Sequence, residues 1–380
     1  MTLPFRKPVK KTLLAVALTA ACAGAGAAHA ETAVTLYGII DIGVGYERIR
    51  GDSFHASRIG EVHGVASGSR VGLRGVEDLG NGLAAVFTLE SGFAPTDGER
   101  QQGGRLFGRQ ATLGLNSTQW GRLEFGRQIN MASELFSLID PFGTSYNAAN
   151  LGTTLGATNT MRLDNLVLYH SPVVSGFQLG VGYSFNADDT LDDGPGFATA
   201  DNNRAVTAGL SYTNGPLFVA AAYDSLRGNA AAAGGQSSAR LREYSLGATY
   251  DFDVVKVAAS VGQTLDGWYV GQTLAIMPGG SEQDFGYFKL ADGFRATSTM
   301  LGLTVPVSNA TAVFTSWQRA APNNSKLTGD DKIFNVYALG ATYTLSKRTN
   351  VYAYASYGHN YAFRDGVTDT AVITGIRHQF

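Results

Sequence analysis

The segment Val372-Ile373-Thr374-Gly375-Ile376-Arg377-His378-Gln379-Phe380 ends the chain and alternates between apolar and polar side chains. Counting back by twos from Phe380 gives one mostly apolar face, and the other face carries Arg377. A strand of this kind with an aromatic carboxy terminus can close a transmembrane β-barrel, in which lipid-facing and water-facing residues alternate. An amphipathic edge strand of a soluble protein has the same pattern, so the rest of the chain must decide.

The first thirty residues have the layout of a secretory signal peptide. Four cations precede an apolar run at 13–21, and Ala28-His29-Ala30 offers a cleavage site. The run is too short for a membrane-spanning helix. We therefore expect a cleaved signal peptide at 1–30 and one exported domain at 31–380. A lipoprotein acylated at Cys22 is the alternative, but the spacing around this cysteine fits it less well.

Composition restricts what the exported domain can be. Cys22 is the only cysteine, so residues 31–380 can form no disulfide. Without the four cations of the signal peptide, 25 Lys and Arg stand against 31 Asp and Glu, a net charge of about −6 that predicts no nucleic-acid partner. No apolar run after Ala30 is long enough for a membrane helix. The 48 glycines, 17 tyrosines and 20 phenylalanines suit twisted strands with aromatic girdles, although a periplasmic β-rich protein would have similar numbers.

Period-two alternation divides the domain into sixteen segments of about ten residues, the length that a tilted strand needs to cross a bilayer. In the first, Val34 and Leu36 share an apolar face while Thr35 and Tyr37 lie on the other. In the eleventh, Lys256 stands among valines and alanines and must face water. The sixteen expected strands lie near 34–46, 69–79, 83–93, 106–117, 121–131, 162–171, 175–185, 203–213, 216–226, 240–251, 254–261, 297–307, 310–319, 333–345, 350–358 and 369–380.

The connections between these strands alternate in length. Tight turns are expected at 79–82, 117–120, 214–215, 251–253 and 346–349. Long polar connections are expected at 49–68, 94–105, 132–161, 186–202, 227–239, 264–296, 320–332 and 359–368. Short periplasmic turns and long extracellular loops are typical of an all-β transmembrane antiparallel barrel. Segment 264–296 is long enough to contain a further hairpin, so eighteen strands remain an alternative to sixteen.

Four arginines near strand ends are candidates for the lining of a pore: Arg70, Arg74, Arg109 and Arg127. Arg70 and Arg74 alternate with Val71 and Leu73, which predicts that both arginines face the lumen. A charge on the lipid face would cost about 2–4 kcal/mol near the midplane. Simple alternation puts Arg127 on the apolar face, so a bulge must redirect it if it lines the pore. The alternative is that these arginines are solvated at the rim or paired with Glu77, Asp78 and Glu90.

The third long connection, 131–160, is a candidate constriction loop. A loop of about thirty residues inside a compact fold is usually functional or disordered. Leu138 and Phe142 are possible apolar anchors, and we expect the loop to fold against the inner wall. Carboxylates on the loop opposite the arginines would set up a transverse field that sorts solutes by charge.

Several motifs together resemble a known family. They are Val34-Thr35-Leu36-Tyr37-Gly38, the stretch 69–83 with Ser69-Arg70-Val71-Gly72-Leu73-Arg74, Arg109-Gln110, the stretch 121–128, Arg162-Leu163-Asp164-Asn165, Tyr169-His170-Ser171-Pro172, and Gly375-Ile376-Arg377-His378-Gln379-Phe380. They resemble the trimeric general porins of Gram-negative outer membranes, and they are spread over the whole mature chain. The resemblance implies sixteen strands, a water-filled pore, a third loop folded into it, and a homotrimer.

The resemblance also implies roles for particular residues. Arg70, Arg109 and Arg127 match the constriction arginines of these porins, and Arg162 is a further basic candidate. Related third loops often read Pro-Glu-Phe-Gly, whereas here Asp140 precedes the proline and no glutamate follows it. Asp140 and Glu134 are therefore the candidates for the acidic side of the constriction. Outer-membrane lipid and lipopolysaccharide are the expected surroundings, and small hydrophilic solutes and ions the expected cargo.

Other classes of function are less well supported. No Gly-x-Ser-x-Gly motif is present, and His170-Ser171 at a strand end suits capping better than catalysis. No His or Cys cluster suggests a metal or other cofactor, and Asp188 to Asp193 lacks the spacing of a calcium loop. A channel selective for sugars or carboxylates, with Trp268, Tyr269 and Trp317 along its path, and a surface adhesin remain alternatives, although these aromatic residues suit the girdles better. The function expected is passive diffusion with a weak preference for anions.

Overall fold

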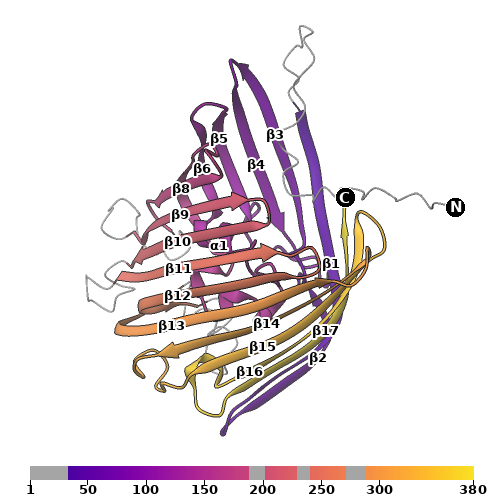
Figure 1. The fold of residues 1–380 in the computed structure, drawn as a ribbon, viewed down its shortest axis with the longest axis vertical. Helices are drawn as coiled ribbons and strands as arrows, with labels where there is room; N and C mark the ends of the chain where they lie inside the picture. Colours follow the sequence, from indigo (N-terminus) through magenta and orange to yellow (C-terminus); the bar gives the residue numbers. More distant parts are fainter. Residues whose placement is uncertain (1–32, 188–201, 229–239, 271–287) are drawn as a thin grey trace, which may run out of the picture.

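The protein is a closed antiparallel β-barrel (Figure 1). The computed structural model describes residues 33–187, 202–228, 240–270 and 288–380. The strands of its single sheet are β1 Ala33–Arg50, β2 His55–His63, β3 Arg70–Gly80, β4 Leu83–Gly92, β5 Gln110–Ser117, β6 Gly121–Ile129, β7 Arg162–His170, β8 Phe177–Ser184, β9 Arg204–Asn214, β10 Leu217–Arg227, β11 Arg240–Asp251, β12 Lys256–Tyr269, β13 Phe288–Pro306, β14 Thr311–Pro322, β15 Phe334–Thr344, β16 Thr349–His359 and β17 Thr368–Gln379.

The barrel wall has the sixteen expected strands, and β2 is one strand more than expected. β1 is long enough to pair with two strands along the same edge. Its first part pairs with β3 up to Ile39, opposite Arg70, and its second part pairs with β2 from Ile42, opposite His63. Segment 64–69 joins the two partners. β2 therefore prolongs the line of β3 beyond the wall and is not a seventeenth position around the barrel.

The terminal strand closes the barrel, as the sequence predicts. β17 pairs with β1 from Ile39 opposite Gln379 to Arg50 opposite Thr368, so the sheet has no open edge there. Phe380 exchanges two backbone hydrogen bonds of 3.1 Å with Gly38. Its ring lies so close to Gly38 that a Cβ on the glycine would come within 2.3 Å of it. The last residue therefore packs directly against the first strand.

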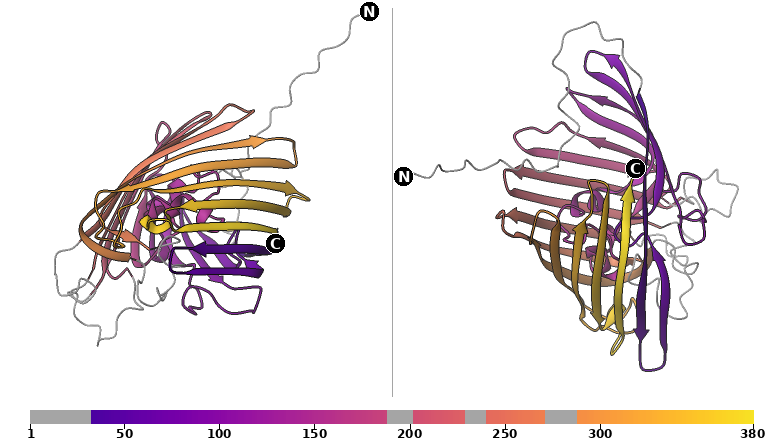
Figure 2. Two further views of the ribbon diagram at one scale, coloured as in Figure 1. Left: turned by 90° about the horizontal axis from the view of Figure 1, so that it is seen from below. Right: turned by 90° about the vertical axis from the view of Figure 1, so that its right-hand side faces the viewer.

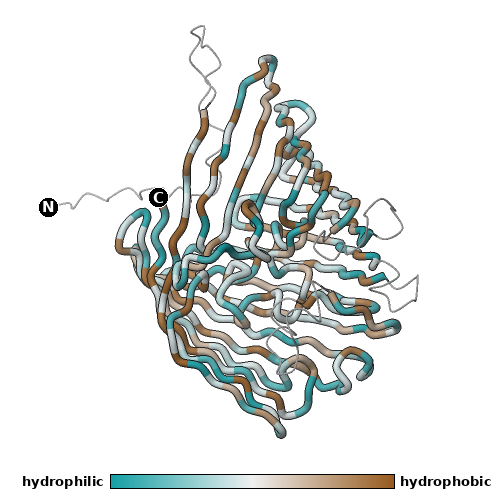
Figure 3. Tube along the Cα trace, turned by 180° about the vertical axis from the view of Figure 1, so that it is seen from behind, coloured by the Kyte–Doolittle hydropathy of each residue, from teal (hydrophilic) through white to brown (hydrophobic). Residues whose placement is uncertain are grey.

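Alternation along the strands separates a membrane face from a lumen face, which Figure 3 shows as alternating brown and teal along the trace. Val34, Leu36 and Val44 on β1 are more than half exposed, whereas Asp41 on the opposite face is fully buried. Lys256 faces the lumen as predicted, and its Nζ donates to the Leu138 carbonyl at 3.1 Å. The apolar outward residues make a barrel surface suited to lipid.

The predicted alternation of turns and loops is present in the described residues. Tight turns join β3 to β4, β5 to β6, β9 to β10, β11 to β12 and β15 to β16. The expected long connection at 264–296 is shorter than predicted, because 264–269 and 288–296 extend β12 and β13 and pair with each other, and these described parts form no further hairpin. β5 begins at Gln110 and not near 106. The expected signal peptide and the Asp188 to Asp193 cluster lie outside the described residues.

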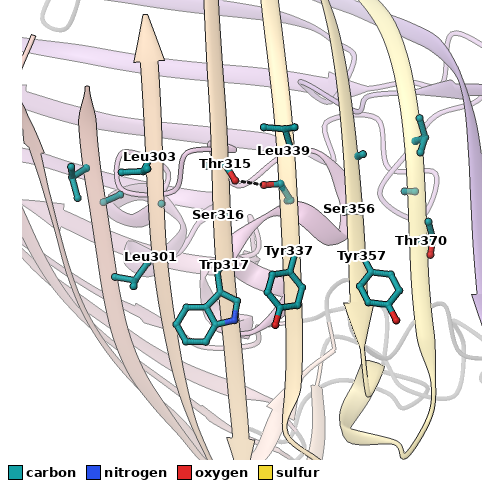
Figure 4. Close-up of a pocket in the computed structure, with 17 residues that line it drawn as sticks. Leu301, Leu303, Thr315, Ser316, Trp317, Tyr337, Leu339, Ser356, Tyr357 and Thr370 are labelled. Atoms are coloured by element: carbon teal, nitrogen blue, oxygen red, sulfur yellow. Dashed lines mark hydrogen bonds between the residues drawn. The ribbon is translucent and has the colours of Figure 1, made fainter. Parts of the chain in front are cut away.

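Aromatic side chains mark one end of the membrane face. Trp317, Tyr337 and Tyr357 lie side by side on β14, β15 and β16, where they line one end of an apolar groove on the outer wall (Figure 4). Trp317 faces outward, as a residue in the expected girdle position must. For Trp268 and Tyr269 the expected girdle position is wrong, because both are almost fully buried in two separate clusters inside the barrel.

Candidate functional site at the barrel constriction

The third loop occupies the lumen. It begins with α1, Met131–Phe136, and continues through three short 3-10 helices, η1 Asn147–Ala149, η2 Leu151–Thr153 and η3 Gly156–Thr158. Asn130 caps α1 through its side chain. α1 packs on β8, β9 and β10, η3 on β12, and η1 on β15 and β16. The loop therefore covers the inner wall from β8 to β16, and Figures 1 and 2 show it inside the barrel.

A stripe of lumen-facing glycines makes room for this loop. On five strands, a Cβ added to the glycine would lie only 2.3–2.9 Å from a side-chain atom of the loop. Contacts this short are excluded for real Cβ atoms, so the loop packs on bare backbone. These glycines and the loop residues that they meet are Gly180 with Met131, Gly209 with Leu135, Gly247 with Ile139, Gly262 with Leu155 and Gly302 with Pro141.

Polar contacts complete the seating of the loop. Asn130 Nδ2 donates to Asp224 at 2.8 Å, and the Ala157 N–H donates to Glu243 at 3.0 Å. Both acids are 1 % exposed, since they lie between the loop and the wall. Buried acceptors of this kind are stabilised by the hydrogen bonds that they receive. Neither acid was singled out from the sequence, and both stabilise the loop.

An aromatic cluster holds the middle of the loop. Phe142 packs edge-on against Phe314 of β14 at 4.9 Å, and Tyr146 packs edge-on against Tyr352 and Tyr354 of β16 at 5.6 and 5.4 Å. The expected anchoring role of Phe142 is confirmed. The same expectation for Leu138 is wrong, because this side chain is 54 % exposed.

Arginines line the part of the wall that the loop leaves uncovered, from β3 to β7. Arg70 begins β3, Arg109 immediately precedes β5, Arg127 lies in β6 and Arg162 begins β7. A fifth, Arg105, joins them from the connection before β5 and was not predicted. We call these five residues the arginine wall. The structure thus brings together four of the arginines that the sequence indicates.

Two carboxylates hold the arginine wall in place. Glu90 of β4 lies 2.7 Å from Arg109 Nε and 3.7 Å from Arg70 Nη1. Asp164 of β7 pairs with Arg127 and, at 2.9 Å, with Arg105. Arg162 donates instead to the carbonyl oxygens of Arg109 and Thr160, at 2.9 and 3.1 Å. Among the residues that the structure describes, five guanidinium groups against these two carboxylates leave an excess of three positive charges.

Arg127 faces inward because the backbone is irregular there. The pairing of β6 with β7 shifts by one residue between Gly126 and Gln128, so that Asp164 and Asn165 together lie opposite Arg127. Gly126 has a φ of 121° and Asn165 a φ of 49°, conformations that ordinary strand residues avoid. The Arg127 side chain is consequently buried, and its Nε donates to the Gly108 carbonyl at 2.7 Å. The bulge that the sequence argument requires is present.

Two further arginines, Arg74 and Arg377, lie beside the arginine wall. Arg74 does not join the ion pairs, and its guanidinium lies 5.4 Å above the Tyr37 ring. Arg377 of β17, which alternation places on the polar face of the terminal strand, donates to Ser67 at 2.8 Å. Segment 64–69 reaches the site as well, because a Cβ on Gly68 would lie 2.5 Å from Arg109. Neither Arg377 nor segment 64–69 was predicted from the sequence to lie at this site. The position of Arg377 on the polar face of the terminal strand would have indicated that it faces the lumen.

The two acidic loop residues have different surroundings. Asp140 is 5 % exposed and accepts hydrogen bonds from the N–H groups of Phe142, Thr144 and Leu151, at 2.9–3.0 Å. Burial raises the pKa of Asp140 to about 6, although the three hydrogen bonds oppose this shift. Glu134 is 41 % exposed at its side chain and lies 3.1 Å from His170 Nε2. These are the only charged residues in 131–160, so the loop carries little charge toward the arginine wall.

Comparisons with known proteins agree with this architecture. A family model described as Gram-negative porin matches residues 17–362. An outer membrane porin of Bordetella pertussis is 53% identical over 390 residues, which cover 98% of this chain and 100% of the relative. Outer membrane porin protein 32 of Delftia acidovorans is 33% identical over 394 residues, with the same coverage.

Solved structures extend the comparison. The anion-selective porin from Comamonas acidovorans superimposes with a TM-score of 0.72 at 28% identity, covering 92% of this chain and 100% of that one. By these matches the chain belongs to the Gram-negative porins, outer-membrane barrels through which small hydrophilic solutes diffuse passively along a water-filled channel.

Proposed function

We propose that this porin conducts anions in preference to cations, and that the arginine wall is the cause. The observation that carries the proposal is the excess of three positive charges opposite a loop with little charge. Rings and rows of charged side chains at a constriction set the ion selectivity of pores. The preference is weak, because a water-filled lumen screens charges beyond about 10 Å at 0.1 M salt.

Glu90 and Asp164 position the guanidinium groups and offset only part of their positive charge. Each carboxylate lies between two arginines, which holds the long side chains in one geometry and lowers their mutual repulsion. Arg162 contacts carbonyl oxygens, so its charge contributes to the potential in the lumen. With Asp140 buried inside the loop, we infer a positive constriction and not a transverse field between two charged faces.

The double variant Arg70→Gln with Arg109→Gln tests the proposal. It removes both arginine partners of Glu90, which keeps only its hydrogen bond from Tyr37, and leaves one positive charge in excess of carboxylates in the arginine wall. In a planar bilayer with a salt gradient, the reversal potential should move toward that of a cation-preferring channel.

Arg319→Gln is the matched control, because Arg319 shares the outward face of β14 with Trp317 and lies outside the lumen. Its reversal potential should equal that of the wild type. An unchanged reversal potential in the double variant would refute the role assigned to the arginine wall.

A path for sugars is less well supported than a path for anions. Two of the aromatic residues considered for it, Trp268 and Tyr269, are almost fully buried, and Trp317 faces outward. Solutes that carry a carboxylate would meet the same arginines as inorganic anions. Porins are transport channels, and we infer no catalytic role for His170, whose ring lies beside Glu134.

We also propose that the protein is a homotrimer in contact with outer-membrane lipid and lipopolysaccharide. The apolar outer faces of β1 and β3, with Val34, Leu36 and Val71 exposed, supply surface for either contact. Native mass spectrometry of the protein extracted in mild detergent would give the number of chains directly. A single-chain mass throughout would contradict the trimer.

A further inference from the structure

The six residues 64–69, which join β2 to β3, are more than the barrel wall needs. Only two residues of β1, 40 and 41, lie between its pairing with β3 and its pairing with β2. Antiparallel strands pair residue by residue, so two residues opposite these would continue the line from β2 into β3. The other four are an insertion, and an insertion in one strand has to leave the plane of the sheet.

Segment 64–69 turns into the lumen and reaches the third loop. Val65 is 1 % exposed, because it packs in the aromatic cluster that contains Phe142 and Tyr146. The Tyr146 N–H also donates to the Val65 carbonyl at 2.7 Å. The insertion is therefore directed toward the inside of the barrel, where it contacts the loop that occupies the lumen.

A buried carboxylate on β1 holds the segment in place. Asp41 faces the lumen and is fully buried. Its side chain accepts hydrogen bonds from the Ser67 N–H at 2.7 Å and from the Tyr352 hydroxyl at 2.6 Å. Its backbone carbonyl accepts from the Gly64 N–H at 3.0 Å, and its own N–H donates to the Ser69 hydroxyl at 3.0 Å. Hydrogen bonds to a charged acceptor are among the strongest in proteins, so Asp41 determines where the segment lies.

The other side of segment 64–69 meets basic residues of the pore. Arg377 Nε donates to the Ser67 hydroxyl at 2.8 Å, and a Cβ on Gly68 would lie 2.5 Å from Arg109 Nη1. The third loop covers the inner wall from β8 to β16, and the arginine wall lines it from β3 to β7. The segment contacts β17 and β1, the two strands of the wall that remain. The loop, the arginine wall and segment 64–69 together surround the channel.

We propose that segment 64–69 is a second constriction element, which limits the size of the solutes that pass, and that Asp41 is its positioning residue. This inference builds on the diffusion channel of the Gram-negative porins and is separate from the preference for anions. Segment 64–69 contains only glycine, alanine, valine and serine, so it adds no charge to the constriction. It acts by occupying cross-section, because passage through a pore depends on the diameter of the pore as well as on the charges along it.

Deletion of residues 65–68 tests the proposal directly. Gly64 and Ser69 would then lie opposite Asp41 and Ile40, so that β2 continues into β3 with its present pairs in register. In planar bilayers at about 1 M salt, where charges are screened beyond about 3 Å, the single-channel conductance should rise about twofold because the channel is wider. Liposomes that contain the variant should swell faster in neutral sugars, and the increase over the wild type should be larger for a trisaccharide than for a monosaccharide. A conductance and a sugar profile equal to those of the wild type would overturn the proposal.

Ser67→Trp tests the proposal in the opposite direction and keeps the full chain length. Ser67 is half-buried inside the barrel, so we expect an indole at this position to extend into the channel. The conductance should fall, and swelling in the larger sugar should slow most. Ser57→Trp is the matched control, because Ser57 is exposed on β2, opposite Arg48 on the outward face of β1. The control should conduct as the wild type does, whereas wild-type conductance in Ser67→Trp would contradict the proposal.

The positioning role of Asp41 is tested by the same two measurements. Asp41→Ala leaves the Ser67 N–H without its acceptor, so the conductance and the size limit for sugars should shift toward those of the deletion variant. Asp41→Asn keeps one acceptor oxygen and should shift them less. The comparison uses only variants that migrate as folded barrels in gels of unheated samples, which separates a wider channel from a loss of folded protein. An unchanged size limit in a folded Asp41→Ala channel would refute the positioning role.

The reversal potential in a salt gradient distinguishes this proposal from the anion preference. Segment 64–69 is uncharged, so its size effect is measured with neutral sugars, whereas the role of the arginine wall is measured by the reversal potential. Each proposal can therefore fail without the other.

Discussion

At the scale of single residues, burial determines what a charged group does. Glu90 and Asp164 lie against the arginine wall and hold its guanidinium groups, whereas Asp140 turns inward and organises the loop that carries it. Residue type alone does not distinguish these roles, because an aspartate on a loop is equally suited to facing a pore or to accepting backbone hydrogen bonds.

Asp140 allows a test by substitution and pH. Asp140→Ala leaves three buried N–H groups without their acceptor, at about 1–3 kcal/mol each, while Asp140→Asn retains an acceptor oxygen. The alanine variant should therefore unfold faster in guanidinium chloride than the asparagine variant. An equal unfolding rate for the two variants would contradict the role assigned to these hydrogen bonds.

The pH dependence follows from the raised pKa of Asp140. Because the folded pKa of about 6 exceeds the usual 3.8, the folded protein binds the proton more tightly. The contribution of this carboxyl to stability should rise as pH falls from about 7 to 4. The difference in unfolding rate between the wild type and Asp140→Asn should change over this range. A difference in unfolding rate that is constant from pH 7 to pH 4 would contradict the raised pKa of Asp140.

At the scale of elements, the third loop and the glycine stripe depend on each other. Gly209→Val would place a branched side chain where Leu135 now packs, since even a Cβ would lie 2.6 Å from that side chain. The loop would have to move away from the inner wall, toward the middle of the lumen. We expect a lower single-channel conductance in planar bilayers.

Gly60→Val is the control for this substitution. A Cβ on Gly60 of β2 would meet no atom within 4 Å, so the same chemical change should leave conductance unaltered. A Gly209→Val channel that conducts as much as the wild type would mean that the loop does not limit the flow of ions.

At the scale of the whole molecule, closure depends on the contact between the last residue and the first strand. Deletion of Phe380 removes two backbone hydrogen bonds to Gly38 and the ring that packs on it. The amount of folded barrel in the outer membrane should fall, while the conductance of inserted molecules should stay the same, because Phe380 shares the outward face of the terminal strand with Val372 and Ile376, whereas the arginine wall lines the lumen. Gel electrophoresis of unheated samples measures the amount of folded barrel, and recording in planar bilayers measures the conductance. Normal assembly of the truncated protein would contradict this role.

The strands, their faces and the tight turns follow from the sequence, because a period of two is a local property of the chain. Val34, Leu36 and the terminal strand to Phe380 show this directly, since each side chain lies on the face that counting predicts. β2 was not predicted, because it lacks this alternating pattern. Its sequence His55–His63 is polar and lies mostly beyond the wall, so no apolar alternation marks it.

Contacts between distant segments were decided only by the tertiary structure. Arg127 turns inward through a bulge that involves β7, and Arg105 joins the wall through Asp164, 59 residues away. Asp140 is buried because the loop folds back on itself, and Trp268 because it packs on Phe294 and Phe363. The sequence by itself determined the barrel, since alternation specifies which face meets lipid. The lining of its constriction depends on which loops and bulges meet across the lumen, and no local pattern encodes that.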